Sequence, residues 1–202
     1  GKGNDERTVR REGRHPHFIH YRLSDIELRA GEEGMEAVHT SPVKGKRYWF
    51  EIKGGALVSE DQEFGGLALL RGRFTPFFGP RISYRALFDG KELLHITSAG
   101  LELSIVQNDF FTWSAYGGAA FFGGVLERSG LDWGFVFDTY LFPPVSFYME
   151  TGGVNFSDIF FGRVEGGLEL HFDRYLLFAG AQLLESDTTR RFTIETGAGV
   201  HF

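Results

Sequence analysis

Apolar and polar residues alternate along most of the chain from residue 47 onward. In the stretch 160–172, Phe160 and Val164 have even numbers, whereas Arg163 and Glu165 have odd numbers. A period of two is typical of a β-strand with one apolar face and one polar face. The same alternation predicts about ten strands, at 47–58, 64–74, 78–88, 93–106, 110–126, 131–142, 145–154, 160–172, 174–184 and 191–202.

The lengths of these segments and their connections predict the fold. Most exceed the five or six residues usual in globular sheets and suit tilted strands that cross a bilayer. The uncharged run 110–126 contains two Gly-Gly pairs and alternating aromatic residues, which favours a strand over a membrane helix. Short links at 107–109, 143–144 and 173–174 alternate with longer, more polar ones, as in outer-membrane barrels. We therefore expect an all-β protein, an antiparallel up-and-down transmembrane β-barrel of about ten strands within a range of eight to twelve.

Alternation alone leaves open which face lines the barrel. A soluble, lipocalin-like ligand-binding barrel turns its apolar face inward, whereas a membrane barrel turns it toward lipid. Opposite charges within single strands, such as Arg163 and Glu165, favour a paired polar interior. Aromatic residues near strand ends predict a girdle at the membrane interface, formed by Tyr48, Trp49, Trp133, Tyr140 and Tyr148. Both arguments favour the membrane arrangement.

The last twelve residues alternate up to the final position. Phe192, Ile194, Val200 and Phe202 share one parity. This ending resembles the C-terminal signature of bacterial outer-membrane β-barrel proteins. The resemblance implies recognition by the barrel assembly machinery, closure by pairing of the last strand with the first, and contact with outer-membrane lipid in a Gram-negative bacterium. It indicates a class of membrane protein and no specific family.

Charged residues on the polar faces form the candidate site. Arg71, Arg73, Arg81 and Arg85 share one parity on neighbouring strands, and Glu102 belongs to the same predicted interior. A transverse field of such charges orients small solutes in a porin-like pore, whereas paired charges fill a small barrel. The complete predicted lumen cluster is Arg71, Arg73, Arg81, Arg85, Glu51, Asp132, Asp138, Arg163, Glu165, Glu169 and Glu195.

A short segment, "HITSAG" at 95–100, is similar to the His-x-Ser-Asn-Ala-Gly stretch of outer-membrane lipid A 3-O-deacylases. The resemblance implies His95 as a base, Thr97 in place of the serine and Asp109 in place of the glutamate. Because two of the three residues depart from the family, we expect no enzyme and assign no catalytic residues. A lipid-modifying hydrolase is one of the alternative functions.

Composition narrows the remaining chemistry. With no cysteine, the chain has no thiolate nucleophile or thiolate metal ligand. A net charge of −6 argues against nucleic acid as a partner. The segment "HPHFIH" places His15, His17 and His20 close together, but a solvated tail explains it better than a metal site, and we expect no metal or cofactor.

Residues 1–46 lack the alternation of residues 47–202. We expect a polar, partly flexible, periplasmic N-terminal extension that contacts a periplasmic or membrane protein partner. Within it, "SDIELRAG" is either a helical turn capped by Ser24 and Glu27 or an extra strand. The whole pattern favours a structural or partner-binding membrane protein, with a narrow pore for small solutes as the first alternative.

Overall fold

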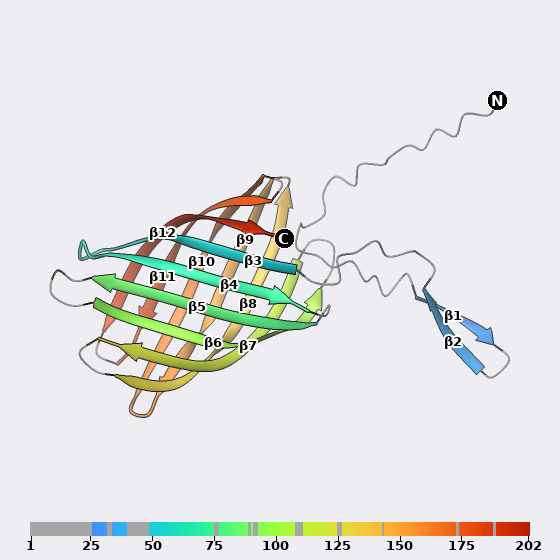
Figure 1. Cartoon of the computed structure of the whole chain (residues 1–202), viewed down its shortest axis with the longest axis horizontal. Coiled ribbons are helices and arrows are strands. Elements are labelled where there is room, and N and C mark those ends of the chain that lie inside the picture. The colour runs from blue at the N-terminus through green and yellow to red at the C-terminus, as the bar shows by residue number, and fades with distance from the viewer. Residues whose placement is uncertain are drawn as a thin grey trace.

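A computed structural model of the chain contains a closed barrel of ten antiparallel strands, β3 to β12 (Figure 1). The structure describes residues 26–31, 34–39, 49–74, 77–88, 90, 93–107, 111–124, 127–142, 144–172, 174–187 and 189–202, with side chains from residue 49 onward. The barrel strands are β3 (Trp49–Ser59), β4 (Phe64–Arg73), β5 (Phe78–Phe88), β6 (Leu93–Gln107), β7 (Phe111–Gly123), β8 (Arg128–Phe142), β9 (Val145–Phe156), β10 (Ile159–Phe172), β11 (Tyr175–Glu185) and β12 (Arg190–His201).

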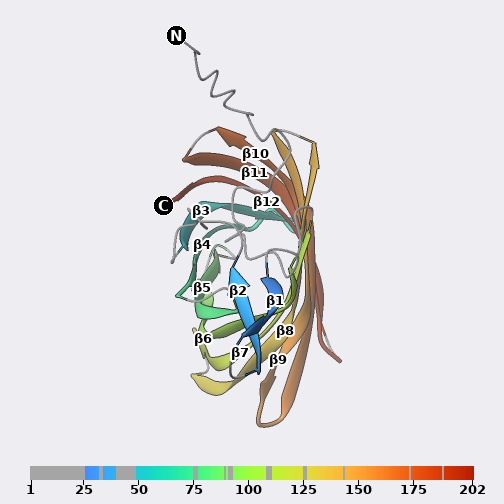
Figure 2. The same ribbon diagram turned by 90° about the vertical axis from the view of Figure 1, so that its right-hand side faces the viewer.

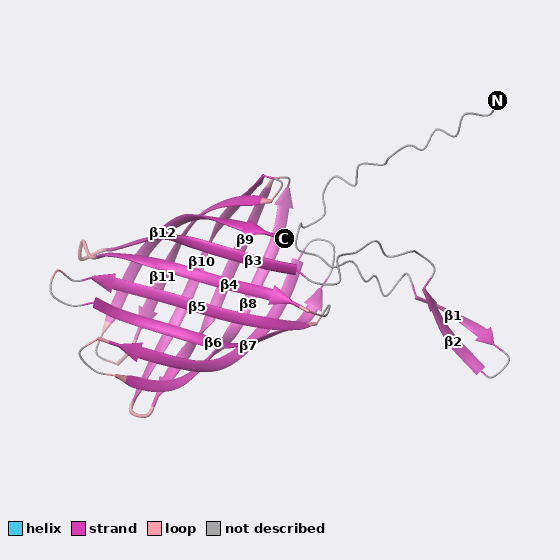
Figure 3. Ribbon diagram, viewed as in Figure 1, coloured by secondary structure: helices cyan, strands magenta, loops and turns pink. Residues whose placement is uncertain are grey.

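The predicted fold is confirmed. Each strand pairs with its sequence neighbours, and β12 pairs with β3 from Thr193 opposite Ser59 to His201 opposite Glu51. This last pairing closes the sheet, so the barrel has no free edge strand (Figure 3). Among the residues that the structure describes, no helix is long and apolar enough to cross a membrane.

A separate hairpin precedes the barrel. Strands β1 (Ile26–Gly31) and β2 (Gly34–His39) pair with each other in antiparallel fashion and form their own two-stranded sheet. Figure 2 shows this hairpin in blue. The strand interpretation of 26–31 is therefore confirmed and the helical one is wrong, because alternation of Ile26 and Leu28 outweighs the capping pattern. Ser24 and the three histidines of "HPHFIH" lie outside the described residues.

The two ends of the barrel differ less in their connections than the sequence predicts. At the end that holds the last residue, the strands are joined through 74–77, 108–110, 143–144 and 173–174. At the opposite end they are joined through 60–63, 89–92, 124–127, 157–158 and 186–189. The connections 89–92, 124–127 and 186–189 are still longer than 108–110, 143–144 and 173–174, as predicted, but 157–158 is not, because residues counted as loop extend the strands. Phe156 and Ile159, for example, still pair across the turn at 157–158.

Apolar side chains face outward and charged ones face inward. On β3, Ile52 and Val58 are 47% and 40% exposed, whereas Glu51 and Lys53 are 1% and 6% exposed. The same alternation continues on β9, β10 and β12, because successive side chains of a strand point to opposite faces of the sheet. The expected outward apolar face is therefore confirmed, and the lipocalin-like arrangement, with the apolar face turned inward, is wrong.

The predicted aromatic girdle is only partly correct. Trp133 is on the outer face, but Trp49 and Tyr148 point into the barrel and are buried. Tyr140 is half-buried, and Tyr48 lies outside the described residues. Parity, rather than position near a strand end, decides the direction of each ring. The exposed rings near the strand ends are mainly phenylalanines, namely Phe64, Phe88, Phe121 and Phe160 at one end and Phe74, Phe77, Phe142, Phe172 and Phe202 at the other.

Inward-facing glycines make room for large side chains that cross the interior. A Cβ atom at Gly134 would lie 2.6 Å from the Tyr116 hydroxyl oxygen. A Cβ atom at Gly180 would lie 2.3 Å from the Tyr148 hydroxyl oxygen. Both separations are below van der Waals contact, so these tyrosine rings occupy space that a larger residue would fill. The high glycine content thus serves the packing of the interior as well as the turns.

Candidate functional site

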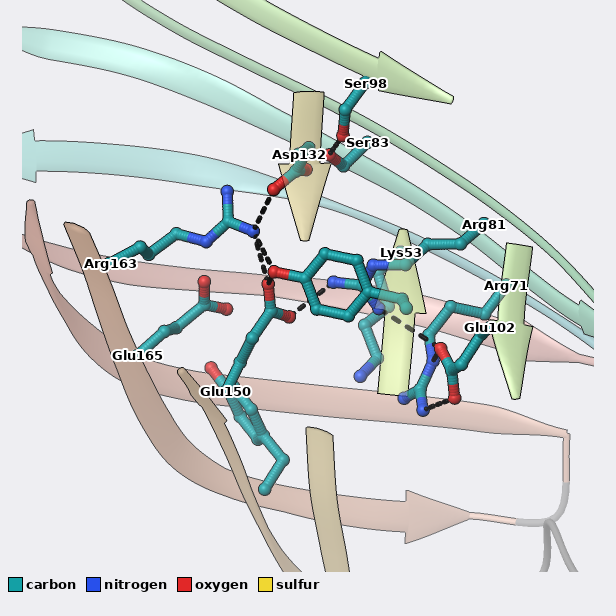
Figure 4. A network of polar contacts seen from close by, with 12 residues as sticks. Lys53, Arg71, Arg81, Ser83, Ser98, Glu102, Asp132, Glu150, Arg163 and Glu165 are labelled. Carbon is teal, nitrogen blue, oxygen red and sulfur yellow. Dashed lines mark hydrogen bonds and ion pairs between the residues drawn. The ribbon is translucent and has the colours of Figure 1, made fainter. Parts of the chain in front are cut away.

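The barrel interior contains a network of ion pairs that joins strands on all sides of the lumen (Figure 4). We call these residues the interior network. Its first part is centred on Glu102, a residue of β6 that is 4% exposed. Glu102 accepts two hydrogen bonds from Arg71, at 2.7 and 3.0 Å, and lies 3.5 Å from Arg73 and 3.4 Å from Arg81. One carboxylate thus faces three guanidinium groups from β4 and β5.

The second part of the network is centred on Glu150 of β9. Glu150 accepts hydrogen bonds from Arg81, from Arg163 at 2.7 Å and from the Tyr116 hydroxyl at 2.9 Å. Arg163 also donates to Asp132, at 3.2 Å, and to the Tyr116 oxygen. These side chains come from β5, β7, β8, β9 and β10, so they join opposite walls of the barrel. Figure 4 shows Arg163, Glu150 and Arg81 reaching toward one another across the interior.

The third part is centred on Lys53 of β3. Its ammonium group pairs with Glu169 of β10 and with Glu51, at 3.2 Å. Glu169 also accepts a hydrogen bond from Ser146, at 3.2 Å, and lies 3.4 Å from His171. These contacts join β3 to β9 and β10 near the end of the barrel that holds the C-terminal residue.

The fourth part is centred on Arg85 of β5. Its guanidinium group pairs with Glu165 and with Glu195, at 3.2 Å. Glu195 also accepts a hydrogen bond from the Tyr148 hydroxyl, and Glu165 accepts one from the Gln182 amide at 3.3 Å. Every arginine of the predicted lumen cluster therefore has a carboxylate partner.

The eleven residues of the predicted lumen cluster all occur in this network. Asp138, for example, lies 2.9 Å from Arg71. Sequence reasoning left Lys53, Glu150, Tyr116 and Tyr148 out of the cluster. Parity is the signal that identifies the first three, since each shares the polar face of its strand. Tyr148 was instead assigned to the membrane interface because it lies near a strand end.

Little free space remains at the level of the network. A cavity of about 30 Å³ lies between Lys53, Arg71, Arg81, Glu165 and Glu195. Since roughly 10–15 Å³ of such space is needed for one water molecule, this cavity has room for about two or three waters. The side chains therefore close the barrel at this level, as is usual for barrels with about eight to ten strands.

The interior is not polar throughout its length. Leu57, Val154 and Phe156 also point inward and are 1%, 1% and 5% exposed. Val154 and Phe156 pack with Ala120 in a small apolar cluster. The predicted polar, paired interior therefore does not extend to the part of the barrel nearest the connections 89–92, 124–127 and 186–189. At that end, the alternation brings apolar residues to both faces of the sheet.

The residues of the C-terminal signature lie on the outer surface. Phe192, Ile194 and Phe202 are 40%, 57% and 48% exposed, and Val200 is half-buried on the same face. Phe192, Ile194 and Val200 belong to β12, which is paired on both sides, and Phe202 follows it with its backbone N–H donating to the Phe50 carbonyl. An apolar ridge on the closing strand is thus accessible from outside the barrel.

The structure describes only part of the deacylase-like site. His95 lies near the start of β6, and its ring centroid is 6.0 Å from that of Tyr84. Asp109, the acid that the resemblance implies, lies outside the described residues. The Nδ1 atom of His95 has no hydrogen-bond partner among the residues described. No described residue therefore acts as a hydrogen-bonding acid at the His95 Nδ1 atom.

Metal chemistry has no candidate in the described part of the chain, where no group of three or more His, Asp or Glu side chains could hold an ion.

The fold and the interior together define the chain as a closed antiparallel β-barrel with an apolar exterior and an ion-paired interior. This arrangement is that of small transmembrane β-barrels and is the reverse of a soluble barrel.

Comparison with known proteins identifies no family. No protein-family model matches the chain, and no curated protein matches it. The N-terminal β-barrel domain of Pseudomonas aeruginosa OprF is similar in structure, with 12% identity, coverage of 79% of this chain and 100% of that one, and a TM-score of 0.39. Ail, the attachment invasion locus protein of Yersinia pestis, is similar with 14% identity, coverage of 77% and 97%, and a TM-score of 0.37.

Proposed function

We propose that this protein is a small transmembrane β-barrel of a bacterial outer membrane, closed by its own side chains. In this proposal it acts as a structural or partner-binding membrane protein rather than as a pore or an enzyme. The observation that carries the proposal is the interior network, in which Arg81, Glu150 and Arg163 meet from different walls of the barrel.

The exterior supports insertion into a bilayer. Leu101, Leu131 and Val164 are 59%, 64% and 51% exposed on three different strands, although each is strongly apolar. In water, such a surface would leave large side chains unburied on all sides, whereas hydrocarbon accepts them without cost. A closed barrel also satisfies every strand's hydrogen bonds internally, which hydrocarbon requires. The bacterial outer membrane is the location in which such barrels are typical.

The interior supports a closed barrel over a narrow pore. A conducting lumen needs a continuous path past its charged residues. Here the space beside Arg71, Arg81 and Glu165 is about 30 Å³. The hydrolase alternative has no support from the site, because the Nδ1 atom of His95 has no hydrogen-bond partner among the described residues.

The proposed partners follow from the surfaces. Membrane lipid would contact the outer apolar face, and the barrel assembly machinery would recognise the outward ridge of Phe192, Ile194 and Phe202 on β12. A periplasmic or membrane protein would bind through residues 1–46. This last part of the proposal has the polar composition of that segment as its support.

The membrane part of the proposal is tested by heat-modifiability. Cells expressing the full chain are fractionated, and the detergent-extracted protein is run on an SDS gel with and without boiling. A closed barrel resists SDS until heated, so the expected result is a mobility shift of protein from the membrane fraction. A soluble protein that shows no shift would contradict membrane insertion.

The closed state is tested by conductance in a planar lipid bilayer. We expect no discrete current steps from the folded protein. A variant that lacks residues 1–46 should be equally silent, because the barrel's own side chains close it. Steps in the full chain would contradict the closed state, and steps that appear or grow on deletion would assign the block to the N-terminal segment instead.

A further inference from the structure

A second, larger cavity lies inside the barrel at the end farthest from the C-terminal residue. Its volume is about 250 Å³, compared with about 30 Å³ between the charges of the interior network. Protein interiors are normally packed so that few voids exceed the size of a water molecule. We call this cavity the cup, and its apolar wall is formed mainly by Leu57, Leu94, Ile96, Phe122, Phe161 and Leu184.

The bottom of the cup, which we call its floor, is formed by residues that border the interior network. Ser83 and Arg85 line both cavities, so they separate the cup from the smaller space below it. The hydroxyl groups of Ser83 and Ser98 form a hydrogen bond, with 2.7 Å between their oxygen atoms. Arg85 is held by two carboxylates of the network. The floor is therefore fixed in position by contacts that do not depend on a ligand.

The charges that line the cup are already balanced. Arg85 pairs with Glu165 and Glu195, and Arg163 pairs with Asp132 and Glu150. Arg191, at the rim, lies 2.9 Å from Glu63. An anionic ligand would find no cation without a carboxylate partner, and a cationic one would lose its own hydration beside guanidinium groups. The electrostatics of the cup therefore favour an uncharged ligand.

The wall of the cup has an aromatic side. The rings of Phe122 and Phe161 are stacked, with centroids 6.4 Å apart and planes inclined by 12°. Each also contacts Phe156 edge to face, with centroids 5.9 and 6.1 Å apart. Aromatic rings gain from stacked and edge-to-face contacts beyond simple burial of area. This side of the wall therefore favours an aromatic ligand over a flexible chain.

The volume sets the size of the ligand. A dry apolar cavity of about 150 Å³ is enough to bind benzene. The cup, at about 250 Å³, has room for one or two fused rings. We propose that the cup binds a small, uncharged aromatic molecule of one or two rings, with Ser83 and Arg85 below it. This inference concerns a ligand site and is independent of whether the barrel conducts or which membrane holds it.

The test uses the full chain in lipid nanodiscs with labelled isoleucine and leucine methyl groups, titrated with indole and followed by NMR. Ile96 and Leu57 report on the cup, and Ile82 and Leu101 report on the outer face. We expect saturable shifts at the two cup residues and only a gradual, non-saturating change at the two outer residues, since indole also dissolves in lipid. Non-saturating shifts at all four positions would overturn the proposal.

A matched pair of variants locates the site. Leu184 lines the cup, whereas its neighbour Leu183 has the opposite parity on β11. Leu184→Trp should fill the cup and weaken the saturable binding about tenfold or more, and Leu183→Trp should leave it unchanged. Equal effects of the two variants would overturn the proposal. If Leu184→Trp shows no heat-dependent mobility shift and so does not fold, Ile96→Phe takes its place, with binding measured from the Leu57 methyl shifts.

The same titration with n-octane tests the ligand class. We expect indole to saturate the cup at lower concentration than octane, because only indole gains contacts with the rings of Phe122 and Phe161. Saturation by octane with no saturation by indole would show that the cup is an alkyl-chain site and that the proposed class is wrong.

Discussion

Replacing Glu102 by glutamine tests whether the interior network stabilises the fold. The substitution preserves shape and removes one buried negative charge. Arg71 retains Asp138, at 2.9 Å, and Arg81 retains Glu150. Arg73 is left with Gln107 and Ser114 as neutral partners, because Glu102 is its carboxylate partner in the described part of the chain. Glu102→Gln thus leaves a buried guanidinium with no carboxylate paired to it directly, and Asp138 acts on it only from a greater distance.

The expected cost follows from that uncompensated charge. Breaking a buried ion pair by removing one partner costs about 3–5 kcal/mol, mainly because the other charge stays buried. Arg73 is 5% exposed, so water screens it little. With a slope of roughly 4 kcal/mol/M in guanidinium chloride, such a loss moves the unfolding midpoint down by about 1 M. Removing both charges together should restore most of the stability, since a neutral pair of similar volume is often tolerated.

The assay is guanidinium unfolding in detergent micelles, followed by tryptophan fluorescence. Asp158→Asn is the matched control, because it also removes one carboxylate from an arginine pair, but with a side chain that is 56% exposed. We expect about 0–1 kcal/mol for this exposed pair. The double variant Arg73→Met/Glu102→Gln should be more stable than Glu102→Gln alone. The reasoning is refuted if Glu102→Gln costs no more than Asp158→Asn, or if the double variant is the less stable one.

Three further predictions concern the exterior, the sheet and His95. Leu101→Arg, on the outer face near the middle of β6, should lower the free energy of unfolding in lipid by about 2–4 kcal/mol. Tyr175→Arg, at a strand end, should lower it by only about 0–1 kcal/mol, and equal costs would argue against a bilayer around the barrel. Gly118→Ala should lower the temperature of the gel-mobility shift, because its Cβ would lie 2.3 Å from a backbone oxygen of β6. Gly117→Ala should leave that temperature unchanged, because its Cβ would have no heavy atom closer than 3.9 Å. The same shift temperature for both variants would be evidence against the close approach at Gly118. Cells expressing the wild-type protein or His95→Ala should have the same lipid A by mass spectrometry, and a difference between them would revive the hydrolase alternative.

Much of the fold is predictable from local patterns in the sequence. Each of the ten barrel strands occurs where alternation predicts it, and β10, for example, runs from Ile159 to Phe172 against a predicted 160–172. Parity also assigns Arg163 and Glu165 to the inside and Val164 to the outside. These features are local because a strand directs successive side chains to opposite faces whatever its neighbours are.

Two errors of the sequence analysis have physical causes. Position near strand ends predicts Trp49 and Tyr148 in a membrane girdle, but both lie on the inward face of their strands, where Gly180 leaves space for the Tyr148 ring. The connections 157–158 and 186–189 are shorter than the sequence predicts, because polar residues such as Asn155 continue the strand pairing almost to the turn. In both cases the contacts of neighbouring strands outweigh the composition of the segment.

The sequence by itself determined the class of fold, a barrel of about ten strands and which charges share one face of their strand. Only the tertiary structure decided which charges pair and where space is left. Lys53 and Glu169 are separated by 116 residues and come together because the sheet closes on itself. The cup likewise depends on strands that meet only across the barrel, with Leu57 on β3 and Phe161 on β10. Alternation determines on which face of its strand a side chain lies, but only closure of the barrel determines which residues that side chain contacts.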